Sequence, residues 1–120
     1  MGKYVKGKER ANLLAAADLF VMPSVSEPFG IVPLEALIES GTPVLISKQS
    51  GVSEVMQHAL KVDFWDVDEM ANKIVATLRH DALRNQLSEK GVEEAHGVTW
   101  EKAAEKCTHV YNEVINKFRK

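Results

Sequence analysis

Two glutamates with seven residues between them, Glu27 and Glu35, flank the stretch of this sequence best suited to hold a ligand. A continuous apolar run precedes the stretch and a helical pattern follows it, so its middle is expected at a helix N-terminus. Gly30 has no side chain, so a ligand could approach the backbone closely there. The backbone amides of residues 30–32 would lie at the positive end of the helix dipole, which favours a phosphate. The two carboxylates can accept hydrogen bonds from sugar or ribose hydroxyls. Together these groups fit a nucleotide-diphosphate sugar. On the residues alone, an ordinary loop carboxylate and a solvated helix carboxylate remain open alternatives.

The elements around this stretch alternate between strand and helix. Apolar runs typical of strands buried on both faces lie at residues 18–22 and 43–47, and residues 60–65 are compatible with a third strand. Helical patterns cover residues 8–17 and 31–40, with Pro33 in the first turn of the second helix and Gly41 at its end. A turn over residues 48–53 leads to a short helix over 54–56. Two successive strand–helix–strand units predict an α/β fold with a Rossmann-like, three-layer parallel sheet.

Three helices are expected from Asp66 to the end of the chain. Asp66 and Thr99 are the predicted N-caps of the first and the third. Apolar residues recur at helical spacing in both, so we expect these helices to form core and cover, with Cys107 as a small buried hydrophobe. The predicted sheet has only about three strands, whereas an independent doubly wound domain usually has five or six. Residues 1–120 are therefore expected to form a single partial domain, or to complete their sheet with another chain.

Composition excludes several classes of protein. The chain has 120 residues, 45% of them hydrophobic and 27% charged, with a formal net charge of -2. This gives no basic field for nucleic acid or an anionic membrane. The basic residues near the start, Lys3, Lys6, Lys8 and Arg10, are expected to be solvated. No run approaches the roughly 18 apolar residues of a membrane span, and no leader-like segment begins the chain, so we expect a cytoplasmic location. The single cysteine is compatible with a reducing compartment.

Residues 26–36, SEPFGIVPLEA, resemble the E-x7-E motif of the retaining GT-B glycosyltransferases of family four, the group 1 glycosyl transferases. Four flanking segments resemble the same family in the same order: 17–24 (ADLFVMPS), 41–44 (GTPV), 50–55 (SGVSEV) and 98–100 (VTW). The resemblance covers nearly the whole chain. It implies the C-terminal half of the donor-nucleotide-sugar-binding domain, in an enzyme that transfers a hexose with retention of configuration.

The resemblance also implies roles for particular residues. Glu27 would be the catalytic residue that contacts donor-sugar hydroxyls near the reacting carbon, and Glu35 would hold the ribose hydroxyls. The backbone of Phe29, Gly30, Ile31 and Val32 would contact the donor sugar and the diphosphate. No metal ion or other cofactor is implied.

The chain departs from the family pattern in two ways. Residues 58–65 replace a stretch that usually contains glycine; His58 there could face the cleft or be an ordinary loop residue. The family's diphosphate-binding Arg and Lys, its base-recognising strands and its acceptor domain would all lie upstream of this sequence. We therefore expect the isolated chain to be inactive.

Two other classes of function remain open on the sequence. One is a non-catalytic α/β binding module that associates with itself or another chain through an exposed sheet edge. The other is a phosphorylase of the same fold, although no lysine here has the context expected for pyridoxal phosphate. The sequence does not choose among nucleotides, sugars or acceptors.

Overall fold

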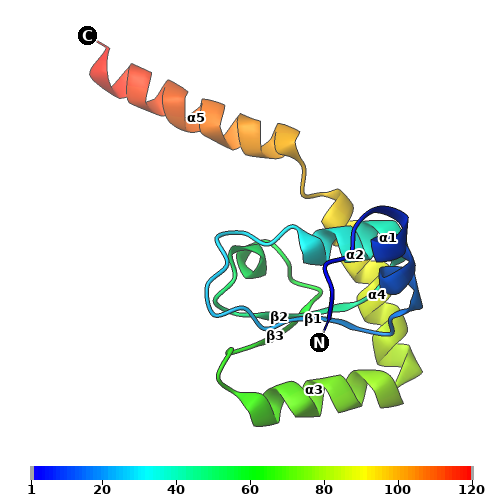
Figure 1. Ribbon diagram of the computed structural model, residues 1–120. Helices are drawn as coiled ribbons and strands as arrows, with labels where there is room; N and C mark the ends of the chain where they lie inside the picture. The colour runs from blue at the N-terminus through cyan, green and yellow to red at the C-terminus, as the bar shows by residue number, and fades with distance from the viewer. Residues whose placement is uncertain (1, 120) are drawn as a thin grey trace.

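A three-stranded parallel sheet forms the centre of the computed structural model, which describes residues 2–119. The elements are, in order, α1 (Gly7–Ala16), β1 (Phe20–Met22), α2 (Val32–Ser40), β2 (Val44–Ser47), the short 3-10 helix η1 (Gly51–Glu54), β3 (Leu60–Val62), α3 (Val67–Arg79), α4 (Asp81–His96) and α5 (Trp100–Phe118). The strands lie in the order β1-β2-β3. Figure 1 shows the sheet between α2 and α3, and α1 and α4 pack against α2. The predicted α/β class and parallel three-layer sheet are confirmed.

Burial follows the position of each strand in the sheet. All four residues of β2 are buried, because β2 has a strand on either side. The three residues of β1 are only partly buried, and so are two of the three in β3. The prediction of a strand buried on both faces is therefore right for β2 and wrong for β1, which is an outer strand. An apolar run does not reveal which strand lies at an edge.

Helix signals in the sequence were reliable. Gly41 ends α2 in the left-handed conformation, with φ 65°, and donates its amide hydrogen to Leu37 O at 2.8 Å. Asp66 caps α3 by accepting from the amide of Glu69 at 3.1 Å. Thr99 caps α5 by accepting from an amide in its first turn. The short helix, in contrast, begins three residues earlier than predicted, because the turn after β2 coils directly into η1.

The last helix is where the prediction of a buried core was wrong. α5 projects away from the body of the molecule, and all of its residues are exposed (Figure 1). Cys107, expected inside, is exposed with it. The periodic apolar face exists, but no described element packs on it. The burial of α3 is intermediate between that of α2 and that of α5. Thr77 is its only buried residue, and Val75 and Leu78 remain nearly half exposed.

The core lies between α2, the sheet and α4. Leu37, Leu45 and Ile46 are fully buried, and so is Met56 after η1. Gly91 of α4 packs so closely on Leu37 that an added Cβ would lie 2.8 Å from a leucine methyl. Within residues 2–119, none of the helices has the length and apolarity that crossing a bilayer would require.

Candidate functional site

The loop between β1 and α2 lies against the turn that follows β2, at the carboxyl ends of the strands. Glu27 and Ser50 form an isolated parallel bridge between the two segments. Gly51 donates its amide hydrogen to Glu27 O at 3.0 Å, and Val52 donates to Phe29 O at 2.7 Å. In open α/β sheets, ligands bind outside these strand ends. The two segments that resemble the family motifs are thus brought together in space.

Buried serine side chains hold this junction in place. Ser47 Oγ donates to Ser24 O at 2.6 Å, which ties the end of β2 to the start of the loop. Ser50 Oγ donates to Ser47 O, and Ser53 Oγ donates to Ser50 O, both at 2.7 Å. The carbonyls of Ser47 and Ser50 also accept the backbone amides of Ser50 and Ser53, both at 3.1 Å, so hydroxyl and amide together fix each turn. The turn is recognisable in the sequence by its resemblance to the family, but its serine network was not predicted; serine at every third position, 47, 50 and 53, was the available signal.

Two glycines make the junction possible, each for a different reason. Gly30 has φ 94°, and an added Cβ would lie 2.9 Å from Met22 Cε and 3.0 Å from Glu27 Cγ. Gly51 faces the carbonyl of Pro28, which would lie 2.0 Å from an added Cβ. Gly30 is buried, so its lack of a side chain serves local packing and backbone conformation. The expected close approach of a ligand at that position stays a prediction.

The start of α2 presents amide hydrogens that have no acceptor in the described part of the chain. Ile31 occupies the N-cap position, and no side chain caps the helix. The amides of Gly30, Ile31 and Val32 donate to no protein acceptor within residues 2–119, and Pro33 has no amide hydrogen. Ile31 is 53% exposed and Val32 is partly buried, so their amides lie near solvent at the positive end of the helix dipole, whereas Gly30 is buried. That a phosphate binds these amides stays a prediction.

The two glutamates lie on either side of this helix start and differ in their surroundings. Glu27 is half-buried in the loop. Glu35, in the first turn of α2, accepts a hydrogen bond at Oε2 from the guanidinium of Arg10. The same guanidinium lies 3.8 Å from Oε1 of Glu39, one turn further along. Arg10 is only 27% exposed, so the expectation that it would be solvated was wrong.

Arg10 leaves part of the Glu35 carboxylate available. Oε1 of Glu35 has no partner among residues 2–119, and the side chain is 34% exposed. A carboxylate offers about four acceptor positions, so one guanidinium contact does not saturate it. The arginine fixes the orientation of a group that can still accept hydrogen bonds from hydroxyls.

Phe29 lies at the rim of an open groove beside the loop. The groove, of about 520 Å³, runs between η1 and the first turns of α5, and Val55, Val98 and Lys102 are among its lining residues. Phe29 is 37% exposed there. The groove places an apolar wall next to the backbone atoms that are predicted to contact the donor.

His58 lies elsewhere. Its amide and that of Gln57 donate to Oε1 of Glu94 on α4, at 2.9 Å and 2.6 Å, and its ring lies 3.3 Å from the other oxygen. The residue anchors a loop to a helix, so of the two alternatives the structure favours the ordinary loop residue. No cluster of three or more potential metal-ligating side chains occurs in the described range.

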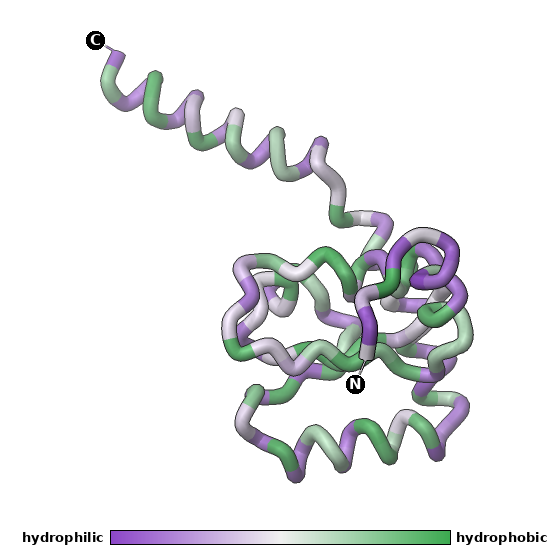
Figure 2. Tube along the Cα trace, in the orientation of Figure 1, coloured by the Kyte–Doolittle hydropathy of each residue, from purple (hydrophilic) through white to green (hydrophobic). Residues whose placement is uncertain are grey.

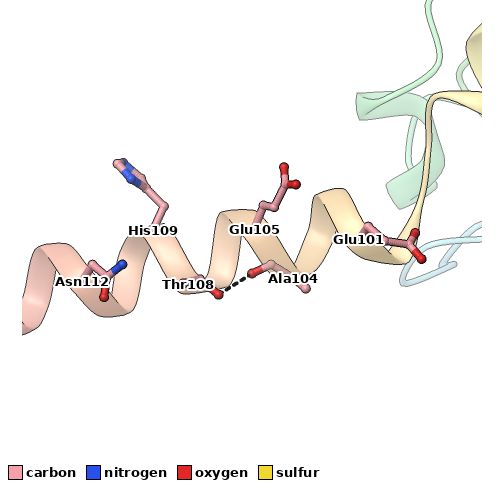
Figure 3. A pocket seen from close by; sticks show the side chains of 6 residues that line it. All are labelled: Glu101, Ala104, Glu105, Thr108, His109 and Asn112. Atoms are coloured by element: carbon pink, nitrogen blue, oxygen red, sulfur yellow. Dashed lines mark hydrogen bonds between the residues drawn. The ribbon is translucent and has the colours of Figure 1, made fainter.

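A hollow on α5 does not form a second site. Figure 3 shows its six lining side chains, all from one face of a single helix, with nothing opposite them. One internal hydrogen bond, from Thr108 to the carbonyl of Ala104, is the only contact drawn.

Comparisons with known proteins bear on the family and the fold of this chain. The family model "Glycosyl transferases group 1" matches residues 1–94. Mannosylfructose-phosphate synthase of Agrobacterium fabrum is 33% identical over 81% of this chain and 22% of its own length. D-inositol 3-phosphate glycosyltransferase of a Nocardioides species is 32% identical over 96% of this chain and 26% of its own. The chain thus spans about a quarter of the length of these relatives.

Solved structures show the same fold. Sucrose-phosphate synthase from Thermosynechococcus elongatus superposes with a TM-score of 0.68 and 31% identity, over 88% of this chain and 27% of that protein. The C-terminal domain of a group 1 glycosyl transferase from Francisella tularensis superposes with a TM-score of 0.71, over 81% of this chain and 51% of that domain. At 22% identity, the second comparison bears on the fold alone.

Proposed function

Because this chain belongs to the glycosyl transferases of group 1, we propose that it forms the C-terminal half of a domain that binds a nucleotide-diphosphate sugar. The observation that carries the proposal is the set of unpartnered amides at residues 30–32, flanked by Glu27 and Glu35. Fixed amide donors at a helix N-terminus suit a diphosphate, and carboxylates on either side suit sugar hydroxyls. The three-stranded sheet and the partial coverage of the relatives support a half-domain.

Each group has a separate role in this proposal. The diphosphate binds at the start of α2, where the amide dipoles are held before the ligand arrives. Glu35 accepts hydrogen bonds from the ribose through the oxygen that Arg10 does not occupy. Glu27 contacts hydroxyls of the transferred sugar near its reacting carbon. Phe29 limits access of water along the groove.

The full-length enzyme would transfer a hexose to an acceptor with retention of configuration. The bond between the anomeric carbon and the diphosphate oxygen breaks while the acceptor oxygen bonds to the same face of the sugar, and the acceptor proton passes to the leaving group. Negative charge grows on the diphosphate as that bond breaks, and preorganised amide donors stabilise it. The isolated chain lacks the acceptor side in this proposal, so it binds the donor weakly and transfers nothing.

An NMR titration of the labelled chain with UDP-, GDP- and ADP-sugars tests donor binding. At least one donor should shift the amide resonances of Gly30, Ile31 and Val32 in a saturable way. Glu35→Gln should weaken binding of that nucleotide sugar, because the glutamine amide has only one oxygen acceptor where the carboxylate has two. Glu39→Gln is the matched control, since Glu39 also lies beside Arg10 but one turn further from the helix start. If none of the donors shifts these three amides, the proposed site is wrong.

A non-catalytic module is the second candidate, and the open edge of β1 favours it. Within residues 2–119, β1 pairs only with β2, so its other edge can accept a further strand. Such a module would associate through that edge and would show no saturable response to any nucleotide sugar. Donor binding at residues 30–32 therefore distinguishes the two candidates.

A further inference from the structure

Arg10 differs from the lysines near the start of the chain, because its side chain is partly buried. Lys3, Lys6 and Lys8 are exposed, whereas the side chain of Arg10 is 27% exposed. Arg10 belongs to α1, which packs against α2 (Figure 1). Figure 2 shows α1 passing from mainly hydrophilic residues at its start to mainly hydrophobic residues at its end. A charge that is partly withdrawn from water needs a partner, and α2 provides it.

Two contacts fix how α1 lies against α2. Leu14, one turn after Arg10 on the same face of the helix, is buried and belongs to the hydrophobic core. Thr42, just after the end of α2, donates its hydroxyl hydrogen to Leu14 O at 2.6 Å. Because the turn that follows Arg10 is anchored in this way, the arginine is held at a fixed place beside α2.

The guanidinium of Arg10 lies between two carboxylates of α2. Nη2 donates to Oε2 of Glu35, and Nη1 lies 3.8 Å from Oε1 of Glu39. The two glutamates are one turn apart on the same face of α2, where like charges repel each other. An arginine can serve both, because its donors are spread over a planar fork, whereas a lysine has a single nitrogen. The Arg10–Glu35 pair is partly shielded from water, so solvent screens it less than a fully exposed ion pair.

This contact determines which oxygen of Glu35 can meet a ligand. Arg10 occupies Oε2, and in the proposed donor site the other oxygen accepts from a ribose hydroxyl. A glutamate side chain that turned freely in solvent would have to be ordered when the ligand binds, which lowers affinity. Because Arg10 orders the side chain beforehand, the gain in affinity goes only to ligands that carry the hydroxyl that Glu35 accepts.

We propose that Arg10 is a positioning residue that sets the preference of the donor site for ribonucleotides over deoxyribonucleotides. The proposal rests on the proposed donor site, and it concerns the contact behind Glu35 rather than a group that touches the ligand. Removing Arg10 also removes a positive charge, but that change acts alike on the ribose and deoxyribose forms of a ligand. The ratio of their affinities therefore separates positioning from a general effect of charge or stability.

Binding of nucleoside diphosphates to the labelled chain tests this role. UDP, GDP and ADP are titrated while the amide resonances of residues 30–32 are followed, and the one that binds is compared with its 2′-deoxy and 3′-deoxy forms. In the wild-type chain, at least one deoxy form should bind about tenfold more weakly, because it lacks a hydrogen bond to a charged acceptor. Arg10→Met keeps most of the apolar stem and removes the guanidinium. It should weaken binding of the ribose form about threefold to tenfold and reduce the ratio to about threefold or less.

Two further variants separate the fork of Arg10 from its charge. Arg10→Lys keeps the charge on a single nitrogen and should restore only part of the ratio. Lys8→Met is the matched control, because it removes the same charge from an exposed position of α1, and it should leave the ratio at the wild-type value. A urea midpoint measured for every variant establishes that the body is folded.

The outcomes distinguish this proposal from the donor site on which it rests. If no nucleoside diphosphate shifts the amides of residues 30–32, the donor site is wrong and the role of Arg10 falls with it. If the wild-type chain prefers the ribose form and Arg10→Met keeps that preference, the donor site stands and only the role of Arg10 is refuted. Equal binding of both forms by the wild-type chain refutes it as well, since Glu35 then holds no ribose hydroxyl. A wild-type ratio in Arg10→Lys, or a reduced ratio in Lys8→Met, would show that charge on α1 is responsible and would overturn the positioning role.

Discussion

Replacing Gly51 with alanine should separate the donor-site loop from the turn that holds it. The added Cβ would lie 2.0 Å from Pro28 O and 2.9 Å from Phe29 Cα, whereas ordinary van der Waals contact begins near 3.4 Å. The neighbour at 2.0 Å is a backbone carbonyl, which cannot rotate away as a flexible side chain would. The loop must therefore move by more than about 1 Å, on the scale at which packed atoms lose their contacts.

The expected cost follows from the interactions that this movement breaks. Two backbone hydrogen bonds cross the junction at this point, from Gly51 to Glu27 and from Val52 to Phe29. Each contributes about 1 kcal/mol net, and overpacking adds roughly 1–3 kcal/mol. Alanine also lowers the conformational entropy of the unfolded chain, which offsets about 0.4–1 kcal/mol of this loss in stability. The free energy of unfolding should fall by about 2–4 kcal/mol, a large part of the roughly 5–15 kcal/mol typical of a domain.

A urea titration followed by circular dichroism measures this change. With a slope of roughly 2 kcal/mol per M, the midpoint should fall by about 1–2 M. Gly2→Ala is the matched control, because an added Cβ at Gly2 has no atom within 4 Å. If Gly51→Ala shifts the midpoint no more than Gly2→Ala does, the two segments are not in the close contact described, and the geometry of the site is wrong.

Three further substitutions test the core, the loop anchor and the isolated helix. Leu37→Ala should lower the unfolding free energy by about 2–5 kcal/mol in a urea titration, whereas Ile38→Ala, 44% exposed, should cost far less. Glu94→Ala removes the acceptor of two exposed loop amides, which water can then solvate, and should cost about 0.5–1.5 kcal/mol by the same assay; Glu93→Ala, at an exposed neighbouring position, should change little. Thr99→Ala removes the N-cap of α5 and should increase hydrogen exchange in its first turns while leaving the urea midpoint of the body unchanged, since α5 stands apart from the body. The packing described would be contradicted if Leu37→Ala and Ile38→Ala, or Glu94→Ala and Glu93→Ala, had equal urea midpoints. A lowered midpoint for Thr99→Ala would contradict it as well.

The sequence predicted the fold where the determining signals are local. Helix ends depend on a few neighbouring residues, and Gly41, Asp66 and Thr99 all act as predicted. The loop from Glu27 to Glu35 could be placed for the same reason, because strand, glycine and helix start are adjacent in the chain. The contact between this loop and the turn at Gly51 joins two segments that are distant in the sequence. Only the resemblance to the family drew attention to both segments.

Long-range contacts account for what the sequence did not predict. Arg10 was grouped with exposed basic residues, and its contact with Glu35 depends on how α1 packs against α2, which no local pattern encodes. The serine network is similar, since Ser47 reaches a carbonyl on a different strand connection. Both details bear on the proposed site, because one orients a carboxylate and the other fixes the loop.

The error over α5 has a different cause. Apolar periodicity establishes that a helix has one face that is stable only when covered, but it does not identify what covers it. Cys107 was predicted to be buried because a single domain was assumed to supply the cover, and the described part of the chain does not supply it.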